Sequence, residues 1–62
     1  RIEDVIVEEI VLTEGKGRTP HFRLVHFDVP EGSGLVPGKR VSVRVTSAFP
    51  NSLRGELKSS PS

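Results

Sequence analysis

Residues 40–57, RVSVRVTSAFPNSLRGEL, decide the fold of this chain. In the first half of the stretch, Val41, Val43 and Val45 alternate with polar residues. Successive side chains of a strand point to opposite faces, so a period of two indicates one buried face and one solvated face. The pattern therefore predicts a strand over residues 40–49.

The second half of the stretch predicts a turn and a partner strand. Pro50 fixes φ and Asn51 tolerates the left-handed region, which suits the tip of a hairpin. In the segment SLRGELK that follows, Leu53 and Leu57 face inward. Gly55 falls on the same inward side, where a barrel often needs a close approach of two strands or a kink. The stretch as a whole predicts a β-hairpin that helps to close a small core.

A further strand is expected in the segment HFRLVHFDV, residues 21–29. Alternation puts one set of side chains on each side of this strand, namely Phe22, Leu24 and His26 against Arg23, Val25 and Phe27. Both sets contain bulky residues. This predicts a strand that is central or that curls around a barrel.

The N-terminal segment IEDVIVEEIVLTEG, residues 2–15, is ambiguous. Its apolar residues also fit a helical stripe, but the abundance of β-branched residues favours a strand. The doubled Glu8-Glu9 interrupts a strict alternation, which predicts a bulge, a turn or a strand end at that point.

Glycine and proline mark the expected connections. The segment EGKG, residues 14–17, predicts a turn with glycines at positive φ, and PEGSG, residues 30–34, predicts a mobile loop. The segment VPGK, residues 36–39, predicts a type II turn with Gly38 at the position that needs positive φ.

These elements predict one all-β domain. Four or five short antiparallel strands without a helix cannot form a stable flat sheet of this size, so we expect a small five-stranded antiparallel barrel of the OB-like or SH3-like kind over residues 1–58. Residues 59–62, SSPS, are expected to form a disordered tail or linker. The chain has no methionine, so we expect it to be part of a longer protein.

Charge is distributed unevenly although the formal net charge is only +1. The first fourteen residues hold one base against five acids, and the rest of the chain holds eight bases against three acids. A basic face attracts nucleic acid, but the opposite charges would also be expected to pair across strands, and the pattern leaves both interpretations open.

The chain offers little for catalysis or metal binding. Its two histidines, His21 and His26, are placed on opposite faces of one predicted strand, and a catalytic zinc usually has three protein ligands. There is no cysteine, no nucleophile-elbow pattern and no phosphate-binding glycine loop. No segment is long and apolar enough to span a membrane and no signal peptide is evident. We expect a monomeric, cytoplasmic module without a catalytic residue, a metal or a cofactor of its own.

Binding of nucleic acid has better support because arginine, which dominates the bases, pairs with phosphate and stacks on bases. Arg44 and Arg54 are expected to point outward from the hairpin and to share one face. Phe22 and Phe49 are close to these arginines in the sequence, and an exposed aromatic side chain would offer a stacking platform. In a chain with only three aromatic residues, each is more often part of the core.

Two segments, GRTPHFRLVHF and VTSAFPNSLRGEL, carry a more specific signal. They resemble the two halves of the TRAM domain found at the C-terminal end of MiaB-type tRNA methylthiotransferases, which are radical-SAM iron–sulfur enzymes. The resemblance covers roughly residues 4–58. Phe22 replaces an asparagine that is frequent in the family, and the connector before Gly17 is shorter than usual.

The resemblance implies a five-stranded antiparallel barrel that binds tRNA for a catalytic domain elsewhere in the same polypeptide. The longer enzyme would methylthiolate an isopentenylated adenosine next to the anticodon with SAM and iron–sulfur clusters, whose cysteine ligands this chain lacks. The resemblance and the arginine pattern together give a set of candidate RNA-binding residues: Arg18, Thr19, Phe22, Arg23, Arg44, Asn51, Ser52 and Arg54.

The leading hypothesis is thus a module that docks a tRNA anticodon arm. One alternative is an intramolecular protein-interaction module that packs on the catalytic domain without touching RNA, marked by an exposed apolar patch and an acidic first strand. Another is a general OB-like binder of single-stranded nucleic acid.

Overall fold

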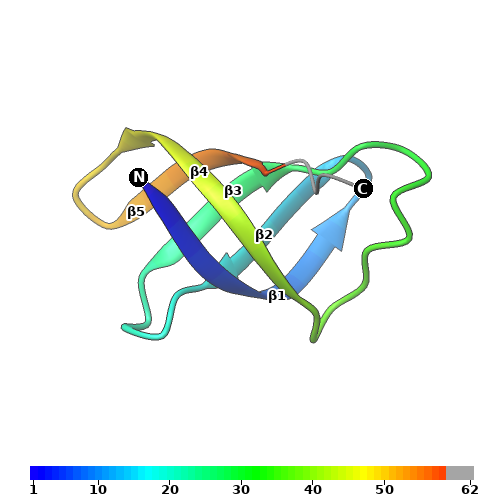
Figure 1. Cartoon of the computed structure of the whole chain (residues 1–62), viewed down its shortest axis with the longest axis horizontal. Coiled ribbons are helices and arrows are strands. Elements are labelled where there is room, and N and C mark those ends of the chain that lie inside the picture. The colour runs from blue at the N-terminus through cyan, green and yellow to red at the C-terminus, as the bar shows by residue number, and fades with distance from the viewer. Residues whose placement is uncertain (59–62) are drawn as a thin grey trace.

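The computed structural model describes residues 1–58, so the tail predicted for residues 59–62 lies outside the described residues. Five strands close into a barrel in the order β1-β2-β3-β5-β4 (Figure 1). Their bounds are β1 Ile2–Val11, β2 Glu14–Arg18, β3 Leu24–Asp28, β4 Arg40–Ala48 and β5 Ser52–Leu57. The predicted all-β class and the small five-stranded barrel are confirmed. No helix in residues 1–58 could cross a membrane.

One detail of the predicted topology is wrong, because the barrel is not entirely antiparallel. Strands β3 and β5 run parallel, and the other four neighbouring pairs are antiparallel. A closed ring with an odd number of strands cannot alternate in direction all the way round. One parallel pair is therefore a geometric necessity of a five-stranded barrel.

The core lies inside this barrel and is small. It consists of Val5, Val7, Val25, Phe27, Val29, Val43 and Leu53, each almost fully buried. Strand β2 contributes no large side chain to it, because its inward positions are glycines. The alternations predicted for residues 40–49 and 52–58 are confirmed, since Val43 and Leu53 point inward while Arg44 and Glu56 are exposed.

The prediction of a turn at EGKG is wrong, because these residues form β2. Gly15 and Gly17 face the interior and neither has a positive φ. A Cβ atom at Gly17 would collide with the backbone carbonyl of Ile6, so glycine here permits β1 and β2 to approach each other closely. The turn lies earlier, at Leu12–Thr13, where Leu12 has a φ of 57°.

The irregularities predicted near Glu8 and Gly38 are confirmed. The register between β1 and β2 shifts between Val7 and Glu9, which is a β-bulge, and β1 bends visibly in Figure 1. Gly38 has a φ of 95° and the N–H of Lys39 donates to the carbonyl of Val36 at 3.3 Å, as a type II turn requires.

Gly55 confirms the close approach that the sequence predicted in the last strand. A Cβ atom there would collide with the carbonyl oxygen of Arg44 and press against Val43. Gly55 is buried and is paired with Val45 across the β4–β5 ladder. The barrel therefore closes between β4 and β5 only because residue 55 has no side chain.

Candidate nucleic-acid interface

The candidate interface lies on the outer face of β1. Strand β1 pairs with β4 from Ile2 to Ile6 and with β2 from Ile6 to Val11. Ile6 is the residue shared by both ladders, with Arg40 opposite it on β4 and Arg18 opposite it on β2. An exposed isoleucine is thus flanked on both sides by outward arginines.

Beyond Arg18, strand β2 ends and the loop of residues 19–23 lies beside the first half of β1. Thr19 organises this loop: its hydroxyl accepts bonds from the N–H groups of His21 at 3.2 Å and Arg23 at 3.1 Å. The carbonyl of Thr19 accepts from the N–H of Phe22 at 2.9 Å, and its own N–H donates to the carbonyl of Arg23 at 3.0 Å. Thr19 is only 4% exposed, so its side chain is used inside the protein.

Phe22 is the prominent feature of this loop. The strand predicted for it is wrong, and of the two interpretations that the sequence left open, core residue or exposed platform, the core is excluded. Phe22 lies outside β3, which begins at Leu24, and it is 79% exposed and so does not belong to the core. Its φ is 64°, a left-handed conformation that is a genuine outlier for a bulky side chain. Phe49 is also exposed, at 51%, and only Phe27 fills the core.

A pocket of about 350 Å³ opens between β1 and this loop. It is lined by Asp4, Ile6, Glu8, Arg18, Thr19, Pro20, Phe22 and Arg40. The structure therefore brings three of the predicted site residues, Arg18, Thr19 and Phe22, to one place. Sequence reasoning missed Asp4 and Arg40, although Arg40 stands on the outward set of the same strand as Arg44 and could have been found from that period of two.

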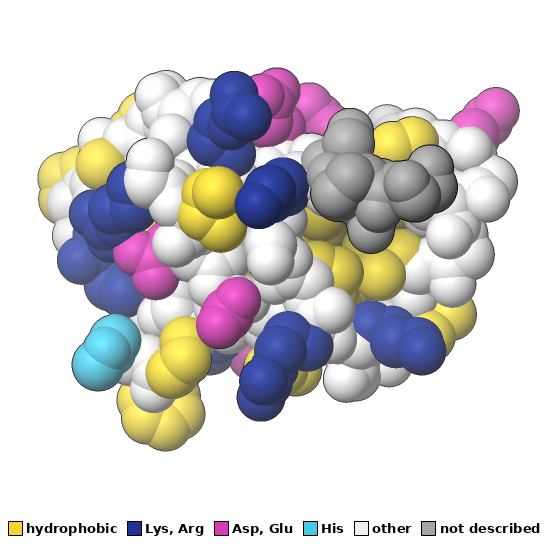
Figure 2. All heavy atoms as spheres, viewed as in Figure 1, with side chains coloured by type: hydrophobic (Ala, Val, Ile, Leu, Met, Phe, Trp, Pro, Cys, Tyr) yellow, Lys and Arg dark blue, Asp and Glu magenta, His cyan; other side chains and the backbone are white. Residues whose placement is uncertain are grey.

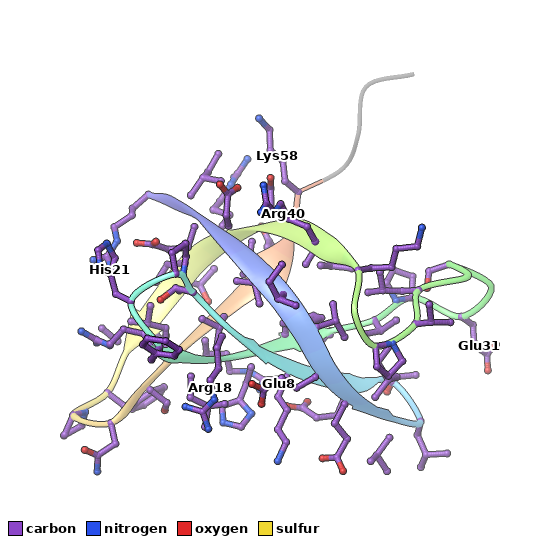
Figure 3. All side chains as sticks on the ribbon, turned by 90° about the horizontal axis from the view of Figure 1, so that it is seen from below. Glu8, Arg18, His21, Glu31, Arg40 and Lys58 are labelled. Carbon is purple, nitrogen blue, oxygen red and sulfur yellow. The ribbon has the colours of Figure 1, made fainter. Side chains whose placement is uncertain are left out.

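The charged side chains of the pocket differ in whether they are paired within the protein. Arg18 is held by the protein: its Nε donates to Glu8 Oε2 at 3.0 Å and its Nη1 donates to the carbonyl of Phe22 at 3.3 Å. Arg18 and Glu8 lie next to each other in Figure 3. Asp4 and Arg40, in contrast, have no ion-pair partner within residues 1–58.

Arg54 occupies a different side of the barrel, and its surroundings were not predicted. Its Nη1 and Nη2 donate to the two carboxylate oxygens of Glu14 at 3.1 and 3.2 Å, and Nη2 also donates to Asp28 at 2.9 Å. His26 Nδ1 lies 3.5 Å from Glu14. The hydrogen bond from Arg54, followed by the charges of Arg54 and His26, outweighs partial desolvation and lowers the pKa of Glu14.

Arg44 and Arg54 consequently do not form the paired surface that was expected. Arg44 lies opposite Glu56, and the register shift between Val45 and Ser47 places Arg54 opposite Ser47. The guanidinium of Arg54 reaches across β3 to β2, whereas Arg44 lies opposite Ile2 on the β1 side. The earlier interpretation that opposite charges pair across strands therefore describes Arg54 well, and it does not describe Arg44, which has no ion-pair partner in the described part of the chain.

The remaining candidates lie at one end of the barrel. Ser52 begins β5 and pairs with Leu24 at the start of β3, so the β4–β5 turn and the loop of residues 19–23 share the left end of Figure 1. The carbonyl of Ser52 accepts from the N–H of Phe49 at 2.8 Å, which confirms the predicted hairpin tip. Asn51 is exposed but does not have the left-handed φ that its type would tolerate. Arg23 is exposed at the edge of the loop.

The histidines give no sign of a metal site. His21 lies in the loop of residues 19–23 and not in a strand, so the argument from opposite strand faces does not apply to it. Among residues 1–58 there is no group of three or more His, Asp or Glu side chains that could hold a metal ion. Figure 3 shows His21 and Glu31 at opposite ends of the molecule.

Figure 2 shows several Lys and Arg side chains spread over the side of the barrel that faces the viewer, where Figure 1 places β1 and β4. Hydrophobic side chains protrude at the lower left of the view, where Figure 1 places the loop between β2 and β3. The fold and this surface define a small OB-like β-barrel with a mixed cationic and aromatic outer face.

Comparison with known proteins places the chain more narrowly. It is 50% identical over 46 residues to a tRNA-2-methylthio-N(6)-dimethylallyladenosine synthase of Vibrio cholerae, with 74% of this chain and 9% of that protein covered. The enzymes of the same name from Cupriavidus necator and Paraburkholderia xenovorans are 45% and 39% identical over 49 and 61 residues. These alignments cover 73% and 92% of this chain, but only 11% and 13% of the relatives. No family model matches the chain.

The predicted resemblance is confirmed: the chain is homologous to a segment of the MiaB-type tRNA methylthiotransferases. It spans about a tenth of the length of the relatives that it matches. That share fits a single TRAM domain.

Proposed function

We propose that this chain is an RNA-binding module that docks the anticodon arm of a tRNA for a catalytic domain elsewhere in a longer methylthiotransferase. The relatives are named for the modification of a tRNA adenosine, and the chain corresponds to a small part of each of them. The iron–sulfur and SAM chemistry implied by the resemblance belongs to that other part, because this chain has no cysteine to ligate a cluster.

The observation that carries this proposal is the β4–β1 face. Arg40 and Arg44 are exposed, point the same way from β4 and have no ion-pair partner within the described residues. Phe22 stands exposed at the pocket that Arg40 also lines. Unpaired guanidinium groups bind phosphates, and an exposed aromatic ring offers a surface on which a base can stack. The arrangement suits a single-stranded loop whose bases are accessible.

The candidate residues take different roles in this proposal. Arg23, Arg40 and Arg44 contact phosphates, and Phe22 contacts a base. Arg18 and Thr19 hold the loop that presents Phe22, through the bonds described above.

The other candidates, Asn51, Ser52 and Arg54, have structural roles in the barrel. Asn51 and Ser52 form the hairpin tip, and Arg54 stabilises the barrel through Glu14 and Asp28. We therefore assign the main phosphate contacts to the β4–β1 face, on the side of the barrel away from the Arg54 ion pairs.

The test is the salt dependence of binding to a fluorescently labelled anticodon stem–loop, measured by anisotropy. If Arg44 neutralises one phosphate, Arg44→Gln should reduce the slope of log affinity against log salt by about 0.7–0.9. The matched control is Lys16→Gln, which removes the same charge from an ion pair with Glu9 at 3.2 Å. Equal slopes in the wild type and Arg44→Gln, or equal losses in both variants, would contradict the proposed surface.

A second candidate function is supported by the apolar residues of β1 and its turn. Ile2, Val11 and Leu12 are all exposed, Leu12 at 92%, and the strand also carries acidic residues. This is the signature expected of a module that packs on its own catalytic domain without touching RNA. Failure of the chain to bind any anticodon stem–loop at low salt would favour this function over the first.

A further inference from the structure

The pocket between β1 and the loop of residues 19–23 contains two features that phosphate binding alone does not use. One is Asp4, an exposed carboxylate without an ion-pair partner among the described residues, placed among cations where RNA would approach. A free carboxylate repels phosphate, so its presence in a phosphate-binding surface needs another explanation. The other feature is the conformation of Phe22.

Phe22 is held in its left-handed conformation by the surrounding structure. The N–H of Phe22 is bound to the carbonyl of Thr19 at 2.9 Å, and its carbonyl accepts from Arg18 at 3.3 Å. Both backbone groups are therefore fixed, and the ring is presented at the pocket with most of its surface in solvent. Backbone strain that the surroundings impose in this way concentrates at ligand-binding sites.

The walls of the pocket combine three kinds of contact. Phe22 and Ile6 provide apolar surface, Arg40 provides unpaired donors, and Asp4 provides unpaired acceptors. Glu8 is the other carboxylate, but Arg18 already binds it at 3.0 Å. Asp4 is thus the acceptor that remains available to a ligand.

Resting on the proposed RNA binding, we infer that this pocket receives one unstacked guanine base. Guanine presents two adjacent donors on its Watson–Crick edge, the N1–H and the N2 amino group, and an ionised carboxylate has two oxygens that accept them side by side. The base stacks on Phe22, its edge meets Asp4, and its phosphate meets Arg40.

Other bases fit these walls less well. Adenine and cytosine each offer one exocyclic amino group to Asp4 and present an unprotonated ring nitrogen beside it, which faces the second carboxylate oxygen without a proton to share. Uracil offers a single N–H flanked by carbonyl oxygens that repel a carboxylate. The unpaired Asp4 therefore selects guanine, while Phe22 contributes affinity without selecting a base.

The experiment compares short labelled oligouridines that carry one central guanosine, inosine or adenosine, titrated with the chain at low salt. Inosine keeps the shape and N1–H of guanine but lacks the N2 amino group, so it isolates the second bond to Asp4. The expected result is about tenfold tighter binding of the guanosine oligomer than of the inosine oligomer. Asp4→Asn should bring the two affinities together.

Two control variants make the result specific. Glu56→Gln makes the same charge change as Asp4→Asn at another exposed carboxylate without an ion pair in residues 1–58, so it should keep the preference for guanosine. Phe22→Ala should weaken all three oligomers by about tenfold, whereas Phe49→Ala, at the other exposed phenylalanine, should not. Circular dichroism of each variant checks that the barrel is intact.

The outcomes separate this inference from the proposed function. Equal affinity of the wild type for guanosine and inosine oligomers, with the anticodon stem–loop still bound, overturns the guanine pocket and leaves RNA binding intact. Binding of none of these RNAs, the stem–loop included, overturns both. A guanosine preference that survives Asp4→Asn overturns the role of Asp4 and with it the inference.

Discussion

Two sides of the barrel carry the same kinds of charged residue and use them differently. On the β2–β3–β5 side, Arg54 is bound to Glu14 and Asp28, and His26 lies beside Glu14. On the β4–β1 side, Arg40, Arg44 and Asp4 have no such partners in the described chain. The residue types are alike, so the neighbours that the fold supplies decide whether a charge stabilises the protein or is left for a ligand.

Strand pairing explains the difference. The parallel β3–β5 ladder places Arg54 opposite His26 and Asp28 opposite Glu56, and β2 adds Glu14 opposite Asp28. Arg54 therefore has two carboxylates within reach on neighbouring strands. On β4, Arg40 and Arg44 lie opposite Ile6 and Ile2 of β1, and Glu56 of β5, although opposite Arg44, forms no ion pair with it within residues 1–58.

The largest effect on stability is expected from Gly55→Ala, which would disrupt the barrel and with it both of the sides compared above. The new methyl group would collide with the carbonyl of Arg44 and the side chain of Val43, so β4 and β5 could not close the barrel. We expect a loss of about 3 kcal/mol in the free energy of unfolding. Thermal unfolding followed by far-UV circular dichroism measures it, since the chain has no Trp or Tyr. Glu56→Ala, the exposed neighbour, is the control and should change stability by less than about 0.5 kcal/mol.

The comparison between the two sides is tested most directly by Arg54→Gln and Arg44→Gln. Arg54→Gln leaves Glu14 and Asp28 without their shared partner, so it should lower Tm, and added salt should shrink the difference from the wild type. Arg44→Gln should leave Tm close to that of the wild type and weaken RNA binding. The reverse result, a stability loss only at Arg44, would show that the two sides have been assigned the wrong way round.

A smaller effect on stability is expected when the pH is lowered. The hydrogen bond from Arg54 holds the pKa of Glu14 below its ordinary value in the folded state. A carboxylate with a lowered pKa contributes stability above its unfolded pKa, and this contribution is lost as the pH falls through its folded pKa. Tm measured from neutral pH into the acidic range should therefore fall more in the wild type than in Arg54→Gln. Parallel curves for the two proteins would refute the coupling, and NMR titration of the Glu14 carboxyl group checks the pKa itself.

The smallest effect on stability is expected from substitution of Leu12, which serves as a comparison for Phe22. These two are the non-glycine residues with positive φ in residues 1–58. Leu12 is at a two-residue turn, where glycine would remove the strain, so Leu12→Gly should raise the free energy of unfolding by up to about 1 kcal/mol. RNA binding should be unchanged. Phe22→Gly should relieve similar strain but abolish the stacking contact, so a variant that keeps full RNA affinity would argue against a role for Phe22.

Much of the fold could be predicted from local pattern. The alternation in residues 40–49, the interruption at Glu8-Glu9 and the turn at Gly38 each depend on residues close in sequence. All three are confirmed, and the structure shows that the interruption, predicted as a bulge, a turn or a strand end, is a bulge. EGKG was misinterpreted because a glycine that permits close packing has the same local signature as one that permits a turn. Phe22 was assigned to a strand because alternation continues through it, whereas the hydrogen bonds of Thr19 turn the chain there.

The candidate site was predicted only in part. Arg18, Thr19 and Phe22 meet at one pocket, and their closeness in sequence made this accessible. Asp4 and Ile6 were missed because they reach the pocket only through the pairing of β1 with its neighbours. The outward direction of Arg40 followed from its strand period, but its place at the pocket depends on the ladder that joins β1 to β4. The partners of Arg54 were missed for the same reason, since Glu14 is forty positions away in the chain.

The sequence by itself determined the strand periods, the turns that need glycine or proline and the family resemblance, because each of these is carried by neighbouring residues. Only the tertiary structure decided which charges are paired. A side chain's direction follows from its place in a strand, but its partner depends on which strand lies alongside and in which register. An odd number of strands requires a parallel pair, and the strand order makes that pair β3 and β5, which brings Arg54 within reach of Asp28 and Glu14. The ladder of β1 and β4 leaves Arg40, Arg44 and Asp4 without an ion pair in residues 1–58.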